Sequence, residues 1–82
     1  MGSIENDLIG RHIDASEGAA EARLLLGPSV WALIAYFKGG AKRNPDVLAG
    51  AYGIPLEAVE AALAYYHRHK AAIDGRIAVN VA

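Results

Sequence analysis

Residues 44–66, which read NPDVLAGAYGIPLEAVEAALAYY, contain two helical patterns that meet across a glycine. Ala49, Gly53 and Val59 fall where a helix-turn-helix needs a small residue, a sharp turn and a buried aliphatic side chain. Gly53 can adopt the positive φ that reverses the chain without a steric penalty. Pro55 suits the first turn of a new helix, where its missing N–H is not needed. This stretch predicts a helix-turn-helix core, a unit that also occurs in proteins that do not bind DNA.

The segment before this core predicts another helix. Residues 27–29 interrupt the preceding pattern and cap the helix, and the glycines at 39–40 end it. Asn44 suits the N-cap of the following helix, which we expect to run from Pro45 to Tyr52. The apolar stripe of the earlier helix consists of Val30, Leu33, Ile34 and Phe37, with Trp31 beside it.

The third helix is predicted to be the longest, from Pro55 to a stop at residues 74–75. One face carries Leu56, Val59, Ala62, Leu63, Tyr66, Ile73 and Ile77. The opposite face carries Glu57, Ala61, Ala64, Arg68 and Ala71. This second face is mostly small and permits the close approach of another helix, although alanine also favours helix on its own account.

Strand patterns flank these helices. Residues 8–14 (LIGRHID) alternate imperfectly, and residues 22–26 (ARLLL) can return as a second strand, which predicts a ribbon over 8–26. Residues 76–82 alternate with period two, which predicts a strand or an arm for a partner; continuation of the helix through Gly75 is the competing interpretation. The sequence therefore predicts one mainly α domain over 1–82, with a three-helix core at 29–74.

Composition limits the classes of function. The chain has 82 residues, no cysteine and a formal charge of −1, so neither a disulfide nor a cysteine-bound metal can stabilise so short a domain. A nearly neutral charge gives no global electrostatic case for nucleic acid. No apolar run approaches the ~20 residues of a membrane span, and the opening residues lack a secretory core, so we expect a cytoplasmic protein.

Three stretches carry a resemblance to a known family: LLLGPSVWALIAYF at 24–37, VLAGAYGIPLEAVEAALAYYHRH at 47–69 and AAIDGRI at 71–77. They resemble small bacterial proteins interpreted as VapB-like antitoxins, which are encoded beside PIN-type ribonuclease toxins. The resemblance covers residues 11–77 and implies a homeodomain-like helix-turn-helix and a homodimeric antitoxin. That family usually carries an Arg-Gly-Thr-Arg segment before its first helix, whereas this chain keeps the glycine, as Gly27, and lacks the Thr-Arg pair.

Candidate contacts with DNA lie outside the third helix. Between Pro55 and Tyr66 no Arg, Lys, Asn or Gln can reach base edges, and Glu57 and Glu60 carry the wrong sign for phosphate, so base reading by this helix is not expected. Acidic residues in a first helical turn are favoured by the helix dipole in any case. Operator DNA could be held through phosphates by Lys38, Lys42 and Arg43; a solvated loop is the alternative for these three residues.

Candidate contacts with protein partners lie on the second helical face and in the tail. Tyr65 stands among alanines and could anchor an interface or cover the ribbon. The expected partner-binding residues are Tyr65, Ala61, Ile77, Val79 and Val81.

No pattern indicates catalysis, a cofactor, a metal site or a small-molecule substrate. The chain has no nucleophile elbow and no phosphate-binding loop, and His67 and His69 are two apart on a helix and point in different directions. Two functions remain open. The first is a dimeric antitoxin that binds a PIN-type toxin, and the second is a helix-turn-helix regulator or interaction module without a toxin.

Overall fold

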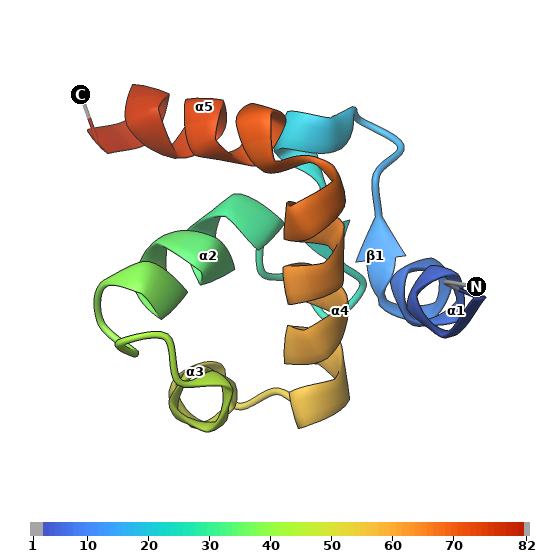
Figure 1. Ribbon diagram of the computed structural model, residues 1–82, viewed down its shortest axis with the longest axis horizontal. Helices are drawn as coiled ribbons and strands as arrows, with labels where there is room; N and C mark the ends of the chain where they lie inside the picture. The colour runs from blue at the N-terminus through green and yellow to red at the C-terminus, as the bar shows by residue number, and fades with distance from the viewer. Residues whose placement is uncertain (1–2, 82) are drawn as a thin grey trace.

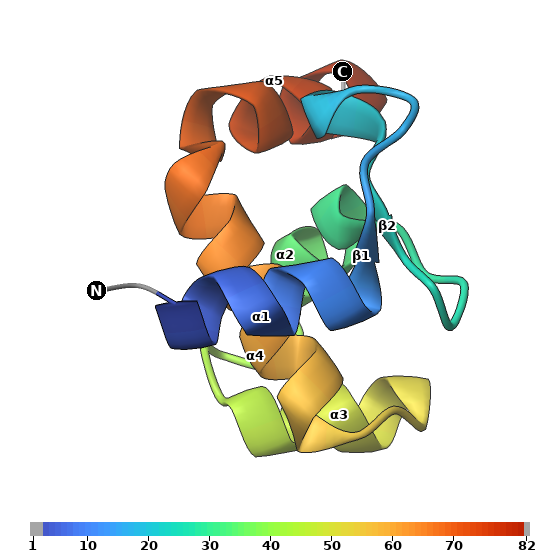
Figure 2. The same ribbon diagram turned by 90° about the vertical axis from the view of Figure 1, so that its right-hand side faces the viewer.

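The computed structural model describes residues 3–81, which form a mainly helical fold with one small antiparallel sheet (Figure 1). The central helix α4 (Leu56–Arg68) is surrounded by the other helices, with α1 and α2 against its sides, α3 near its beginning and α5 crossing its end (Figures 1 and 2). The remaining elements are α1 (Ser3–His12), β1 (Ile13–Asp14), the 3₁₀ helix η1 (Ala19–Glu21), β2 (Arg23–Leu24), α2 (Val30–Lys38), α3 (Pro45–Tyr52) and α5 (Lys70–Val81).

The local signals for α2 and α3 are confirmed. The side chain of Asn44 accepts hydrogen bonds from the backbone N–H groups of Asp46 and Val47, at 3.0 and 3.4 Å, and so caps α3. Gly53 ends α3 in the left-handed conformation, with φ 64° and ψ 37°. Sequence alone therefore defined both ends of α3.

Residues 53–55 connect α3 to α4, and the chain bends by 117° between the two helices. Leu48 of α3 and Val59 of α4 are both fully buried in the angle that this bend creates. Ala49 packs against the same core, and its carbonyl accepts hydrogen bonds from the N–H groups of Gly53 and Ile54. The expected small residue, sharp turn and buried aliphatic residue thus all lie at this junction.

The core is continuous from the ribbon to α5. The two ribbon strands contribute Ile13 and Leu24, and the other large members of the core come from α2, α3, α4 and α5. Its largest fully buried side chains are Leu24, Leu33, Ile34, Leu48, Ile73, Val30 and Val59.

The predicted strand at 8–14 is wrong over most of its length, because residues 3–12 form α1 and only Ile13–Asp14 pair with β2. The four-residue spacing of Ile9 and Ile13 suits a helix as well as an extended chain. Asp7 and Arg11 are also four apart, and their side chains pair at 3.0 Å along α1. The ribbon is correspondingly short, and its return strand is Arg23–Leu24.

The predicted strand or arm at 76–82 is also wrong within the described residues, because the chain is helical through Val81. Ile73 is fully buried and Ile77 packs against the core, and their spacing of four residues outweighs the period-two pattern of the tail. Gly75 is exposed inside α5, where a glycine costs only about 1 kcal/mol relative to alanine.

The third predicted helix is divided into two helices. His69, with φ −129° and ψ 39°, interrupts it between α4 and α5, and no glycine or proline marks the break. The break turns α5 across the end of α4, so that Ile73 enters the core beside α2 (Figure 1). The predicted stop at residues 74–75 is therefore misplaced.

The alanine face of α4 is covered by α1 of the same chain. Glu57 and Arg68, at the two ends of this face, both contact side chains of α1, and Ala61 and Ala64 between them are buried. The expectation of a closely packed second helix is met within one molecule.

Among residues 3–81 no single helix is long and apolar enough to cross a membrane; only α3 and α4 counted together, across their bend, reach that length and apolarity.

We expect Ala61→Leu to lower the free energy of unfolding by about 1–3 kcal/mol, because a larger side chain must push α1 away from α4. Ala71→Leu is the control, since Ala71 is exposed on α5 and its substitution should change stability by no more than about 0.5 kcal/mol. Urea unfolding followed by circular dichroism measures both. Equal midpoints for the two variants would contradict the close packing of α1 on α4.

Candidate functional site

Lys38 lies in a polar network that joins three helices. Its ammonium group donates a 2.6 Å hydrogen bond to the hydroxyl of Tyr66 on α4 and a 3.1 Å bond to a carboxylate oxygen of Asp74 on α5. The hydroxyl of Tyr66 in turn donates to the same oxygen of Asp74 at 2.7 Å. The Lys38 charge is therefore balanced inside the chain, which removes Lys38 from the group of cations free to hold phosphate.

The protonation of this network follows from its hydrogen bonds. The Tyr66 hydroxyl and then the Lys38 ammonium hold the pKa of Asp74 below its ordinary value. The bonds to Tyr66 and Asp74 raise the pKa of Lys38. Both groups are therefore charged at neutral pH, and they fasten α5 to α2 and α4.

Lys42 and Arg43 lie in the turn between α2 and α3 and are both exposed. They adopt left-handed conformations with φ 50° and 61°, which are uncommon for residues with a side chain. The turn is fixed by hydrogen bonds from the N–H of Ala41 to the carbonyl of Tyr36 and from the N–H of Arg43 to the carbonyl of Phe37, at 2.8 and 2.7 Å.

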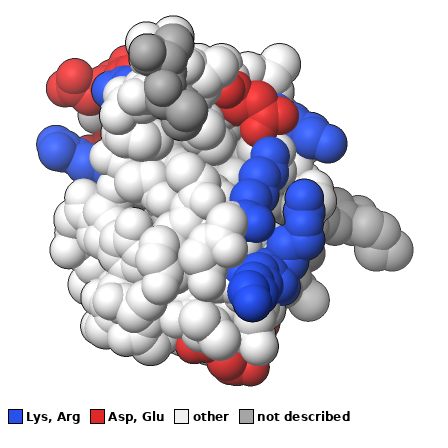
Figure 3. All heavy atoms as spheres, turned by 90° about the vertical axis from the view of Figure 1, so that its left-hand side faces the viewer, with Lys and Arg blue, Asp and Glu red and all other residues white. Residues whose placement is uncertain are grey.

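Neither Lys42 nor Arg43 forms an ion pair with a carboxylate of residues 3–81. Figure 3 shows Lys and Arg side chains gathered along one side of an otherwise largely uncharged end of the molecule. Of the three predicted phosphate contacts, Lys42 and Arg43 thus remain available to a partner.

Tyr65 and Ala61 lie in the core rather than on the surface. The Tyr65 hydroxyl donates a 3.4 Å hydrogen bond to the carbonyl of Ala19 in η1, and burial raises the pKa of this hydroxyl. Its ring packs on that of His69, with 4.4 Å between the centroids. Because Ala61 is also fully buried, neither residue can contact a partner while the fold is intact. Tyr65 covers the chain between the two strands, which is the alternative interpretation of this residue.

The three predicted contacts of the tail differ in exposure. Ile77 packs against the core, whereas Val79 is 72% exposed. The side chain of Val81 lies outside the described residues. Only Val79, among the side chains described, offers the apolar surface expected of the tail.

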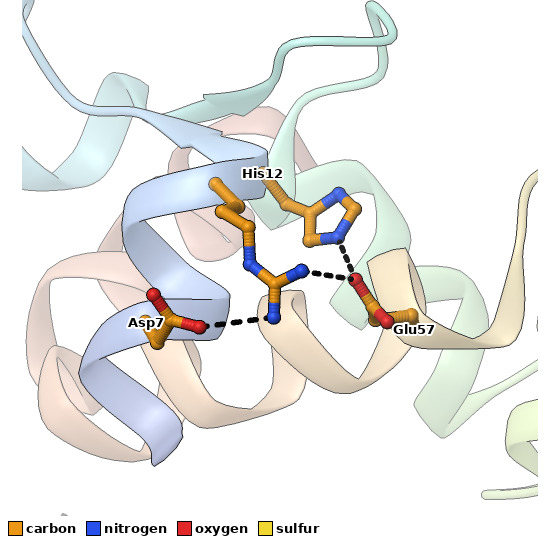
Figure 4. A network of polar contacts seen from close by, with 4 residues as sticks. Asp7, His12 and Glu57 are labelled. Carbon is orange, nitrogen blue, oxygen red and sulfur yellow. Dashed lines mark hydrogen bonds and ion pairs between the residues drawn. The ribbon is translucent and has the colours of Figure 1, made fainter. Parts of the chain in front are cut away.

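A polar network between α1 and α4 was not predicted from the sequence. Glu57 accepts a 2.6 Å hydrogen bond from the Nε2 of His12 and lies 3.7 Å from a guanidinium nitrogen of Arg11, which also pairs with Asp7 (Figure 4). The His12 bond, and then the nearby Arg11 charge, lower the pKa of Glu57. The four-residue spacing of Asp7 and Arg11 could have indicated a helix here, but residues 8–14 were predicted to be a strand.

Arg76 anchors α5 to the segment between the strands. Its Nε donates a 2.8 Å hydrogen bond to Glu21 of η1, and its guanidinium lies 4.7 Å from the ring centroid of Trp31. Arg76 also contacts Asn80 one turn later. These contacts hold in place the second half of α5, where the sequence predicted a strand or an arm for a partner.

Within the described part of the chain, no group of three His, Asp or Glu side chains could hold a metal ion, and no pocket is present. Comparisons with family models, curated proteins and solved structures find no match for this chain. The functional argument therefore rests on the surfaces and networks above.

We expect Tyr66→Phe to lower stability at neutral pH, because it removes the hydroxyl that bonds both Lys38 and Asp74. Asp74 has a lowered pKa, so its contribution is present above the ordinary value of 3.8 and disappears as pH falls through the folded value. Lys38 has a raised pKa, so its contribution is present below 10.5 and disappears as pH rises through the folded value. Urea unfolding is measured from acid to alkaline pH. The difference in midpoint between wild type and Tyr66→Phe should be largest between these two pH limits. A separation independent of pH, or one matched by the control Tyr52→Phe, would exclude this role.

Proposed function

We propose that this protein is a dimeric antitoxin of a type II toxin–antitoxin system, which neutralises a PIN-type ribonuclease by binding it. The resemblance of residues 11–77 to VapB-like antitoxins supports this function. The structural observation that carries the proposal is the position of α1 across α4, which favours protein binding over base reading.

The geometry of α3 and α4 supports a helix-turn-helix with a homeodomain-like origin. Two helices joined by a three-residue turn and bent by 117° fall within the range of this motif. With α2 packed against both α3 and α4, this geometry supports the three-helix unit that the resemblance implies.

The second helix of this unit is poorly placed to read bases. A recognition helix must enter the major groove with its first residues against base edges. Here Glu57, in the first turn of α4, is bound by His12 and Arg11 of α1, and Arg68 at the other end contacts Asn6. A regulator that reads its operator through α4 would first have to release α1.

Contact with operator DNA is consequently limited to phosphates. Lys42 and Arg43 are the predicted phosphate contacts that no carboxylate of the described residues neutralises. Two such contacts per chain give weak binding that decreases steeply with salt. Autoregulation, if it accompanies toxin binding, depends on these two cations in each copy of a dimer.

Exposed apolar side chains support dimer formation. Leu25 and Leu26 are 66% and 58% exposed in the loop between β2 and α2. The loop is held by hydrogen bonds from the N–H of Leu24 to the carbonyl of Pro28 and from the N–H of Leu25 to the carbonyl of His12, both at 2.8 Å. Two neighbouring leucines on a fixed loop form an apolar contact that a second copy can cover.

The function is tested in cells. We expect the gene to adjoin a PIN-type reading frame whose product stops growth when it is expressed alone. Co-expression of this chain should restore growth, and the two purified proteins should elute together in size-exclusion chromatography. Growth arrest that persists despite a soluble, folded chain would exclude the antitoxin function.

The dimer contact is tested by substitution. We expect Leu25→Glu/Leu26→Glu to raise the dimer dissociation constant by at least about a hundredfold, because each leucine buried at an interface contributes roughly 1.5–3 kcal/mol. Ile4→Glu is the control, since Ile4 is 79% exposed on α1. Sedimentation velocity over a concentration series measures both variants. A dimer unaffected by the leucine substitutions would move the contact to another surface.

A further inference from the structure

One end of the molecule combines a largely uncharged surface with a cationic edge. Residues 24–37, 47–56 and 77–81 contain no Asp, Glu, Lys or Arg, and they supply most of α2 and α3 and the end of α5. Figure 3 shows the broad uncharged area at this end, where α2, the following turn and the end of α5 lie in Figure 1. This area is the uncharged end surface.

An ordered pair of aromatic rings belongs to the helices of this end. Tyr36 is 38% exposed, and its ring meets that of Tyr52 edge-on, with 5.8 Å between the centroids. The Tyr36 ring also lies over Gly40, where an added Cβ would come within 2.8 Å of it. Tyrosine is enriched in protein interfaces, and a ring fixed in this way loses little entropy on binding.

The cationic edge is formed by Lys42 and Arg43, which maintain an unfavourable backbone conformation. Left-handed φ values are sterically unfavourable for a residue that carries a Cβ, and glycine would remove that cost. The chain has glycines at 39 and 40 but places two cations in the left-handed positions. Such strain is concentrated at binding sites, and here it keeps two charges exposed at a fixed position.

The charges of this end select the partner. A second copy would bring another Lys42 and Arg43 to the contact against one nearby carboxylate, Asp46 at the start of α3. Each copy thus adds a net positive charge, and the surface does not complement itself. Nucleic acid would meet two cations beside a wide uncharged area, which gives few phosphate contacts. A protein surface that is apolar in its centre and carries carboxylates along one edge complements both the uncharged area and the cationic edge.

We infer that the uncharged end surface, with Lys42 and Arg43 at its edge, docks a partner protein whose contact surface is apolar and bordered by carboxylates. In the toxin–antitoxin interpretation this partner is the toxin, so the inference deepens the proposed function. The exposed apolar side chains that α2, α3 and α5 contribute, Tyr36, Val47 and Val79, supply binding energy, and the cations fix the orientation of the partner.

The inference is tested with synthetic peptides, so that it does not depend on the toxin. Two amphipathic helical peptides share a leucine face and differ in one edge, which carries glutamates in the first and lysines in the second. They are titrated into the full ¹⁵N-labelled chain at physiological ionic strength, and backbone amide shifts are recorded. We expect the glutamate peptide to shift amides of α2, residues 39–44 and α3 more than those of α1, whereas the lysine peptide leaves them in place.

Charge reversal supplies the matched control. Lys42→Glu/Arg43→Glu should weaken binding of the glutamate peptide by about tenfold, while Arg23→Glu, at an exposed arginine of β2, should change it by less than about twofold. Unperturbed spectra of the free variants establish that they are folded. Shifts centred on α1 or η1, no binding of the glutamate peptide, or equal losses in the two variants would overturn the inference.

Two other occupants are distinguished in the same spectra. A short DNA duplex that shifts these amides more strongly than the glutamate peptide would assign the surface to nucleic acid. Shifts of these amides on concentrating the chain alone would assign it to a second copy, and either result overturns the inference. Growth rescue tests the antitoxin function separately. A chain that binds the glutamate peptide but does not restore growth has the docking surface, and its partner is then not the proposed toxin.

Discussion

The close packing of α1 against the alanine face of α4 is the constraint on which this fold depends. Ala61 and Ala64 are small enough for two helices to approach, and polar side chains fasten the pair at both ends of the contact. α2, α3 and α5 then enclose the remaining surface of α4 (Figures 1 and 2). A chain of 82 residues without cysteine obtains a continuous core by surrounding one helix on nearly all sides.

This enclosure also determines where function can lie. The helix that would read DNA in a helix-turn-helix is committed to internal contacts, and residues 3–81 offer neither a pocket nor a metal-binding group. What remains is the outer surface: exposed leucines in a fixed loop, an uncharged end and the exposed cations Lys42 and Arg43. Exposed apolar and cationic surfaces are suited to binding another macromolecule, which is the physical basis of the proposed antitoxin role.

Local chemistry made α3 predictable, because Asn44, Pro45 and Gly53 act through their own backbone geometry. The helices α1 and α5 were misassigned, because spacings such as that of Ile9 and Ile13 fit a helix and an extended chain alike. Lys42 and Arg43 could be predicted as exposed cations beside a turn. The pairing of Lys38 could not be predicted, because its partners Tyr66 and Asp74 lie on helices distant in sequence. Tyr65 was ambiguous because a helical pattern shows which residues share a face and not what covers it.

The pairing of α1 with α4 also imposes an order on folding. Asn6 meets Arg68 across 62 residues of chain, and His12 meets Glu57 across 45. As the polypeptide leaves the ribosome, α1 emerges before α4, so the docking site of α1 does not exist until residues 56–68 have followed. Contacts so distant in sequence form only after a long loop has closed. Docking of α1 is therefore a late step, although α1 is made before α4.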